Sequence, residues 1–172
     1  MEHKIRIPPG ALVRERWRST PQQLQEEARQ EIDMMQRQGI IPLVSVSKPC
    51  GSLRLCVDYQ KLNVLTAFDA FPMPHIAHLL EKIGETRYIF TIALAGGYWQ
   101  ILMRPSDCAK TAFRTPWALF EFLRMPFGLK GAAATFQRLT DSLLAPDAAY
   151  ADAYIKDIVI FTTKWTQHLH AL

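Results

Sequence analysis

The sequence predicts an α+β domain, in which helices are interspersed with short antiparallel strands. Three observations carry this prediction. Apolar residues recur at helical spacing in three stretches, and short apolar or alternating segments separated by Gly, Pro or Asp follow from Tyr88 onward. The composition, with 49% hydrophobic and 21% charged residues over 172 positions, is typical of one globular domain with its own core.

The first predicted helix begins at Thr20-Pro21-Gln22-Gln23, which combines an N-cap threonine, a proline at the first helical position and a glutamine that completes a capping box. Gly39 ends this helix. Its apolar face is formed by Leu24, Ala28, Ile32 and Met35. Residues 1–19 are polar and proline-bearing, so we expect them to form an extended lead-in.

Two strand-like pieces and a second helix follow the first helix. The strand-like pieces are Leu43–Ser47 and Leu53–Asp58, with Gly51 as the turn between them. Pro74 opens the second helix and Gly84 closes it. Its apolar positions are Ile76, Leu79, Leu80 and Ile83.

Strand-like segments dominate the chain from Tyr88 onward. They are Tyr88–Leu94, Trp99–Met103, Thr111–Arg114 and Leu119–Leu123. A third helix is predicted over Gly131–Leu144. It is followed by a predicted hairpin with strands Ala151–Ile155 and Ile158–Thr162 and a turn at Lys156-Asp157. Because no repeat interrupts the pattern, we expect one continuous domain with a weak subdivision near residue 85.

Charge, hydropathy and cysteine content narrow the function classes. The net charge of +4 and the pI near 9.1 permit nucleic-acid binding without requiring it. No apolar run approaches the roughly 18 residues of a membrane span. Three cysteines without a CxxC pair argue against a disulfide framework and against a zinc knuckle, and fit a reducing compartment. We therefore expect a soluble intracellular domain, cytoplasmic or nuclear, with no membrane partner.

Four segments carry a more specific signal through their order and spacing. They read GSLRLCVDYQKLN at Gly51–Asn63, FTIALAGGYWQI at Phe90–Ile101, KTAFR at Lys110–Arg114 with EFLRMPFGLKGAAATFQ at Glu121–Gln137, and YIKDIVIF at Tyr154–Phe161. Together they strongly resemble the reverse transcriptases of gypsy-type LTR retrotransposons, from about Ile32 to the last residue.

The resemblance implies a right-hand polymerase fold with fingers at about residues 20–84 and a palm at about 85–172, the palm being an antiparallel sheet covered by helices. The thumb and the ribonuclease H domain would lie beyond residue 172, so none is expected here. The family is an RNA-directed DNA polymerase that acts on an RNA/DNA primer–template with deoxynucleoside triphosphates (dNTPs). Its nucleotidyl transfer uses two Mg²⁺ ions, which need a cluster of carboxylates.

The sequence departs from the family at these metal-binding carboxylates. The family places one Asp at the end of the first palm strand and two in a YxDD hairpin turn, whereas this chain has Ala93, Lys156 and Asp157 at these positions. The formal charge of the three changes from −3 to 0, because Lys156 contributes +1 and Asp157 contributes −1. A lysine ammonium cannot ligate Mg²⁺ and opposes its arrival. We therefore expect no tightly bound metal and a catalytically inactive copy, a pseudoenzyme. Asp152 lies on the incoming strand and is not expected to replace a missing ligand. From the order of the motifs, we expect Ala93 and Lys156-Asp157 to converge within one small pocket.

The resemblance also assigns nucleotide-contacting positions. Arg54 matches a fingers arginine that meets the triphosphate, and Lys48 matches a second phosphate contact, although Pro49-Cys50 alters that loop. Tyr98 matches the aromatic residue under the sugar, and Phe127-Gly128 lies in a turn that contacts nucleotide and template. Without the resemblance, Arg54 reads as a solvated strand residue and Tyr98 as a packed one.

Two alternatives stay open at this point. Besides the inactive copy, the chain could be a retained nucleic-acid or protein interaction module, which needs only the fold and a basic surface, or an active polymerase domain with unseen metal ligands. For the inactive copy we expect weak, salt-sensitive binding to primer–template. The pair His75-x-x-His78 has no Cys or carboxylate companion at ligand spacing, so we expect both histidines to be polar surface residues rather than metal ligands.

Overall fold

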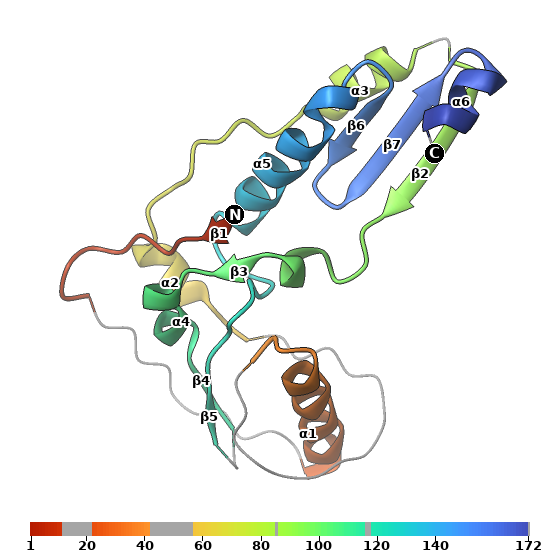
Figure 1. The fold of residues 1–172 in the computed structure, drawn as a ribbon. Helices are drawn as coiled ribbons and strands as arrows, with labels where there is room; N and C mark the ends of the chain where they lie inside the picture. Colours follow the sequence, from red (N-terminus) through yellow and green to blue (C-terminus); the bar gives the residue numbers. More distant parts are fainter. Residues whose placement is uncertain (12–21, 42–56, 85, 116–117, 172) are drawn as a thin grey trace. The chain divides into compact units, whose positions relative to one another are not determined.

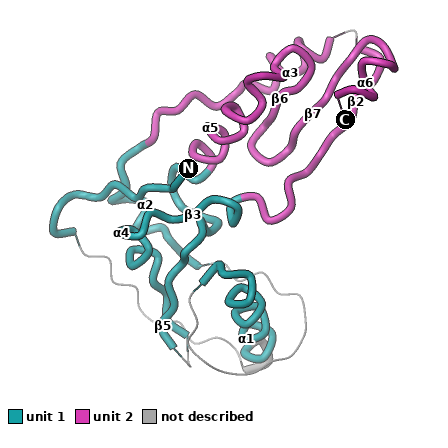
Figure 2. The backbone as a smooth tube through the Cα atoms, in the orientation of Figure 1, with its two compact units in different colours: residues 1–68, 98–132 teal, residues 69–97, 133–172 magenta. Residues whose placement is uncertain are grey.

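The computed structural model describes residues 1–11, 22–41, 57–84, 86–115 and 118–171. The chain divides into two compact units, coloured separately in Figure 2. Unit 1 comprises residues 1–68 and 98–132, and unit 2 comprises residues 69–97 and 133–172. Both units are built from two separate stretches of chain. The division into fingers and palm near residue 85 stays a prediction.

Unit 1 combines one long helix and shorter ones with pairs of two-residue strands (Figure 1). Its helices are α1 (Gln22–Arg37), α2 (Gln60–Leu65) and α4 (Pro105–Cys108), with a 3-10 turn at Ala109–Thr111. Its strands are β1 (Glu2–His3), β3 (Leu102–Met103), β4 (Phe113–Arg114) and β5 (Leu119–Phe120). β1 pairs with β3 in parallel, and β4 pairs with β5 antiparallel. The core of this unit is closed by the fully buried side chains Met35, Ile41, Leu62, Ile101, Phe122 and Met125.

The first residues of the chain are tied into unit 1, although the sequence predicted only an extended lead-in. The buried carboxylate of Asp107 accepts a hydrogen bond from the Ile5 N–H at 3.0 Å, and Lys110 Nζ donates to the Ile5 carbonyl at 2.8 Å. Lys110 also pairs with Asp107. A strand of two residues is set by such long-range partners and not by a hydrophobic pattern, so the sequence did not reveal β1.

Unit 2 contains a three-stranded antiparallel sheet in the order β2-β7-β6. Its strands are β2 (Tyr88–Ala93), β6 (Ala151–Tyr154) and β7 (Asp157–Thr162), and its helices are α3 (Ile76–Ile83), α5 (Ala132–Leu144) and α6 (Trp165–Ala171). Figure 1 shows α5 running beside β6, and α5 bonds to that strand through Gln137, whose Nε2 donates to the Ala153 carbonyl at 3.0 Å. α3 reaches β6 through the Lys82–Asp152 ion pair, at 2.6 Å. An antiparallel sheet with helices packed on it confirms the predicted α+β class.

Several predicted elements are confirmed and others are wrong. α1, α3, α5 and β2 form within a few residues of their predicted bounds, and the hairpin forms as predicted. The predicted apolar face of α3 is not buried, since Ile76 and Leu80 are exposed. Its turn lies at Ile155-Lys156, one residue earlier than predicted, because Asp157 already pairs with Tyr154 as the first residue of β7. The predicted strand Trp99–Met103 is wrong in its first half, which forms a 3-10 turn at Gly97–Gln100. The predicted pieces Leu43–Ser47 and Leu53–Asp58 lie wholly or mostly outside the described residues.

None of the helices in the described part of the chain has the length and apolar character that crossing a membrane requires.

Candidate functional site

The ends of β2 and β7 bring together Ala93, Lys156 and Asp157, the three positions that the resemblance matches to metal-binding aspartates. Ala93 and Asp157 are direct cross-strand partners, and the Leu94 N–H donates to the Lys156 carbonyl at 2.9 Å. Residues directly opposite each other in an antiparallel pair project to the same face of the sheet, with Cβ atoms about 4.5–5.5 Å apart. The predicted convergence of Ala93 with Lys156 and Asp157 is therefore confirmed at the level of the backbone. All three are exposed to solvent.

The charges at this position do not suit a pair of divalent cations. Lys156 Nζ lies 3.2 Å from Asp157 Oδ1, so the remaining carboxylate already contacts an ammonium. Both side chains are about half exposed, at 54% and 53%. Ala93 contributes a methyl group and no oxygen. Mg²⁺ is bound by oxygen ligands, usually carboxylates with waters, and a set of one carboxylate, one methyl group and one ammonium does not fit that requirement. Within the described ranges, no three His, Cys, Asp or Glu side chains are grouped so as to hold a metal ion.

The turn that carries Lys156 is held in an unusual backbone conformation. Ile155 has φ of 55°, in the left-handed region that β-branched residues avoid. The Ile155 N–H donates to Oε1 of Gln137 at 2.7 Å. Gln137 is fully buried, and its Nε2 donates to the Ala153 carbonyl at 3.0 Å and to Asp141 Oδ1 at 2.6 Å. One side chain of α5 therefore bonds both to β6 and to the first residue of the turn. Sequence reasoning listed Gln137 only as the last letter of a motif and missed this role.

The predicted sugar-contacting and turn residues lie together in unit 1. The rings of Tyr98 and Phe127 have centroids 5.3 Å apart, and Trp99 meets Phe127 edge-on at 5.6 Å. Phe127 remains 48% exposed. Gly128 has φ of 87°, a conformation that explains why a glycine follows Phe127.

Asn63, inside α2, holds this turn in place. Its Nδ2 donates to the Gly128 carbonyl at 2.7 Å, and its Oδ1 accepts from the Lys130 N–H at 2.7 Å. Lys130 Nζ in turn donates to the Thr66 carbonyl at 2.8 Å. The side chain of Lys130 therefore contacts the chain's own backbone. Sequence reasoning did not single out Asn63, and its only signal was its place as the last residue of the first motif. The predicted phosphate contacts Arg54 and Lys48 lie outside the described residues.

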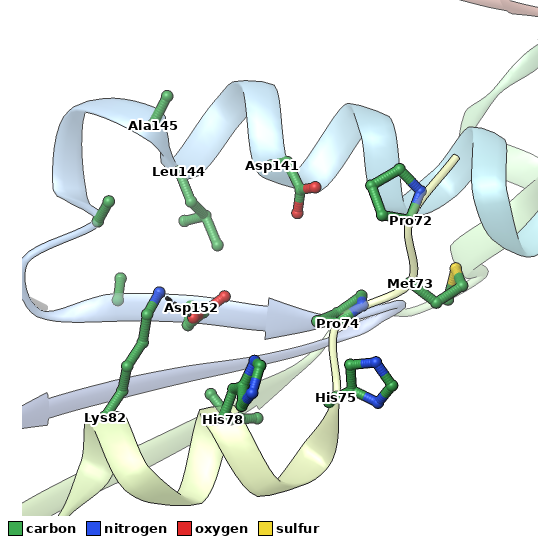
Figure 3. A pocket seen from close by; sticks show the side chains of 13 residues that line it. Pro72, Met73, Pro74, His75, His78, Lys82, Asp141, Leu144, Ala145 and Asp152 are labelled. Carbon is green, nitrogen blue, oxygen red and sulfur yellow. Dashed lines mark hydrogen bonds and ion pairs between the residues drawn. The ribbon is translucent and has the colours of Figure 1, made fainter. Parts of the chain in front are cut away.

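A cavity of about 490 Å³ lies elsewhere in unit 2, between α3, α5 and β6 (Figure 3). The Lys82–Asp152 ion pair stands at its wall, so the carboxylate of Asp152 is engaged on the strand. His75 and His78 meet edge to face with ring centroids 5.5 Å apart. Ala93, Lys156 and Asp157 are not among the residues that line this cavity. The expected single small pocket around these three residues is therefore not this one.

Comparison with known proteins supplies the family. The model of the family described as "Reverse transcriptase (RNA-dependent DNA polymerase)" matches residues 46–172. The chain is 40% identical over 134 residues to the retrovirus-related Pol polyprotein from transposon 297 of Drosophila melanogaster, covering 77% of this chain and 13% of the polyprotein. It is 37% identical over 163 residues to that from transposon opus of the same organism, covering 86% of this chain and 16% of the polyprotein. The chain thus spans less than a fifth of the length of these polyproteins.

A shorter relative and solved structures also point to reverse transcriptases. An RNA-directed DNA polymerase homolog of Oenothera berteroana is 34% identical over 123 residues, covering 69% of this chain and 84% of the homolog. Among solved structures, the foamy viral protease-reverse transcriptase in complex with an RNA/DNA hybrid superposes with a TM-score of 0.79 at 22% identity. The match covers 96% of this chain and 24% of the viral one. At that identity the likeness shows the fold, that of the fingers and palm of a right-hand polymerase.

Proposed function

The chain belongs to the reverse transcriptase (RNA-dependent DNA polymerase) family, in its LTR-retrotransposon form, and from this premise we propose that it binds nucleic acid without catalysing nucleotidyl transfer. The observation that carries the proposal is the contact of Lys156 Nζ with Asp157 Oδ1 at 3.2 Å, directly beside Ala93. The proposal makes the chain a retrotransposon-derived domain that keeps the family's fold and not its reaction.

The electrostatic argument concerns the charge that the protein offers. Family members use two divalent cations to polarise the reacting oxygens and to offset the charge of the triphosphate. Three carboxylates would supply −3 against the mutual repulsion of those cations. Here the sum is 0, because Ala93 is neutral and Lys156 cancels Asp157. A bound dNTP would have to hold the metal almost alone, so productive binding of Mg²⁺ and dNTP is not expected.

The binding part of the proposal does not depend on the missing carboxylates. The net charge of +4 favours a phosphate backbone, and the exposed ring of Phe127 beside Tyr98 offers an apolar surface for a base or sugar. Arg54 and Lys48 are proposed to add phosphate contacts. Binding through phosphates is independent of sequence and falls steeply with salt.

Primer extension tests the catalytic part. We would incubate the purified chain, Ala93→Asp, Lys156→Asp and the double variant with a labelled primer on an RNA template, in Mg²⁺ or in Mn²⁺. We expect no extension by the unmodified chain or by either single variant, because each single change leaves one defect in place. The double variant is the minimum that restores the three carboxylates. Metal-dependent extension by the unmodified chain, abolished by Asp157→Asn, would overturn the proposal.

Fluorescence anisotropy with a labelled RNA–DNA hybrid tests the binding part. We expect micromolar or weaker affinity that is similar for unrelated sequences and decreases as salt rises. Absence of binding at low ionic strength would leave a protein-interaction module as the remaining function, and affinity that does not change with salt would contradict a phosphate-based mode.

A further inference from the structure

Lys156 places a cation where the family has a metal-binding carboxylate, and this exchange changes what the turn can bind. We propose that Lys156 Nζ contacts a backbone phosphate of the bound nucleic-acid strand directly, so that binding at this turn requires no divalent cation. The inference rests on the proposed function, since it assumes that the chain binds nucleic acid. The inference names the ligand of the turn, a backbone phosphate, and the cation that neutralises it, the Lys156 ammonium.

The charge of the turn permits an anion to approach. Three carboxylates at the ends of β2 and β7 would repel a phosphate unless cations stood between them. With Ala93 opposite Asp157 and Lys156 beside it, the formal charges of the three residues sum to 0, and the Lys156 side chain is exposed to solvent. A lysine ammonium is a compact point charge with three N–H donors and is a common phosphate ligand. At most one of these donors is used by Asp157, at 3.2 Å.

The backbone and stem of Lys156 are fixed while its ammonium group is open. The Lys156 carbonyl accepts from the Leu94 N–H at 2.9 Å, which anchors the root of the side chain to the end of β2. A Cβ atom at Gly97 would lie 3.6 Å from the Cβ atom and 3.9 Å from the Cδ atom of Lys156. The stem therefore lies over this buried glycine. The side chain is 54% exposed, so a phosphate can reach Nζ from solvent.

The ion pair between Lys156 and Asp157 is weak enough for a phosphate to compete for the ammonium. Ion pairs between exposed side chains contribute little stability because water screens them and the side chains lose freedom. A phosphate arriving at Nζ competes with the carboxylate for the ammonium and is also repelled by it. Asp157 therefore opposes phosphate binding in this chain, whereas in a metal-dependent site the same carboxylate would promote it. The effect of removing the Asp157 charge on affinity therefore distinguishes metal-free binding from metal-dependent binding.

The test uses fluorescence anisotropy of a labelled RNA–DNA hybrid in EDTA and in Mg²⁺ at matched ionic strength. Four variants of the full chain are compared, namely Lys156→Gln, Lys156→Arg, Asp157→Asn and Lys82→Gln. The last is the matched control, because Lys82 is also half exposed, at 52%, and is also paired with an aspartate of unit 2. Circular dichroism melts establish that each variant is folded.

We expect the unmodified chain to bind equally well in EDTA and in Mg²⁺. Lys156→Gln should weaken binding about threefold to tenfold and lower the slope of log affinity against log salt by about 0.9, the value for one phosphate contact. Lys156→Arg should retain the affinity and the slope, and Asp157→Asn should tighten binding. Lys82→Gln should change the affinity less than about twofold, because a charge remote from the strand is screened.

Loss of binding in EDTA, weaker binding by Asp157→Asn, or equal effects of Lys156→Gln and Lys82→Gln would overturn the inference. These failures are distinct from those of the proposed function. If the unmodified chain binds the hybrid but Lys156→Gln does not differ from it, only the inference falls. If the unmodified chain does not bind at low salt, the binding part of the proposed function falls with it, and extension of a primer would refute the catalytic part alone.

Discussion

The buried side-chain oxygen of Gln137 accepts a hydrogen bond from the N–H of Ile155 at 2.7 Å, and this bond links α5 to the turn between β6 and β7. The turn needs such support because Ile155 adopts φ of 55°. The same amide also donates to the carbonyl of Ala153. The position of Lys156 therefore depends on a polar side chain inside the core of unit 2.

Replacing Gln137 tests that dependence. Gln137→Met keeps the approximate volume but leaves the Ile155 N–H and the Ala153 carbonyl without this partner. We expect the free energy of unfolding to fall by about 2–4 kcal/mol, since each unsatisfied buried group costs about 1–3 kcal/mol. Urea denaturation followed by circular dichroism measures the loss. Ser142→Ala, on the exposed face of the same helix, is the control and should change it by less than about 0.5 kcal/mol. A Gln137→Met variant as stable as its parent would show that the turn is held by other contacts.

The strain at Ile155 makes a second prediction. Asparagine tolerates the left-handed region, whereas valine shares the β-branched shape of isoleucine. We expect Ile155→Asn to be more stable than Ile155→Val by about 1 kcal/mol, although asparagine is the more polar replacement. Thermal unfolding of the two variants side by side measures the difference. The reverse order would mean that the partly buried Ile155 side chain is held mainly by packing.

The longer elements of the fold were largely predictable, because apolar patterning and the Gly and Pro residues at their ends mark them in the sequence. Ile32 and Met35 of α1 are buried at the predicted spacing, and β2 occupies the predicted segment. The short elements were not predictable in this way. The strand Glu2–His3 exists because Leu102–Met103 lies beside it, and a pair so distant in sequence leaves no local pattern.

In the candidate site, too, some features were predictable from the sequence and others were not. The approach of Ala93 to Asp157 followed from motif order and is confirmed by the strand register. The roles of Gln137 and Asn63 could not be inferred, because the partners of a polar side chain are chosen by tertiary packing. The roles given to Asp157 and Tyr98 stay predictions, as do those of Arg54 and Lys48.

Tyr59 provides a prediction on pH dependence. Its hydroxyl donates to the Thr111 carbonyl at 3.1 Å, and burial raises the pKa of this phenol well above its ordinary value of 10.0. The unfolded chain therefore loses this proton first. The stability that the neutral phenol contributes is complete below about pH 10 and is lost as the pH rises above that value.

The Tyr59→Phe variant should remove this dependence. We expect its free energy of unfolding to be lower by about 1 kcal/mol at neutral pH, from the lost hydrogen bond, and to fall less steeply than that of the parent between about pH 9.5 and 11. Ser142→Ala, at an exposed position of α5 without a group that titrates in this range, serves as the control and should leave the slope unchanged. Parallel curves for Tyr59→Phe and the parent would contradict a buried neutral phenol.

The last prediction concerns Mg²⁺ and the folded state of the double variant, independently of any activity. Ala93→Asp with Lys156→Asp would gather three carboxylates at the ends of β2 and β7, where Ala93 and Asp157 are cross-strand partners. Like charges placed opposite each other destabilise a sheet by roughly 0.2–1 kcal/mol, so without metal the double variant should melt below the parent. A cation that binds the folded state alone stabilises it by RT ln(1 + [L]/Kd), about 2.7 kcal/mol at a hundredfold excess over Kd. Millimolar Mg²⁺ should therefore raise the melting temperature of the double variant and leave that of the parent unchanged, at ionic strength matched with NaCl. A rise of the same size in the parent would show that Asp157, despite its contact with Lys156, still holds a divalent cation.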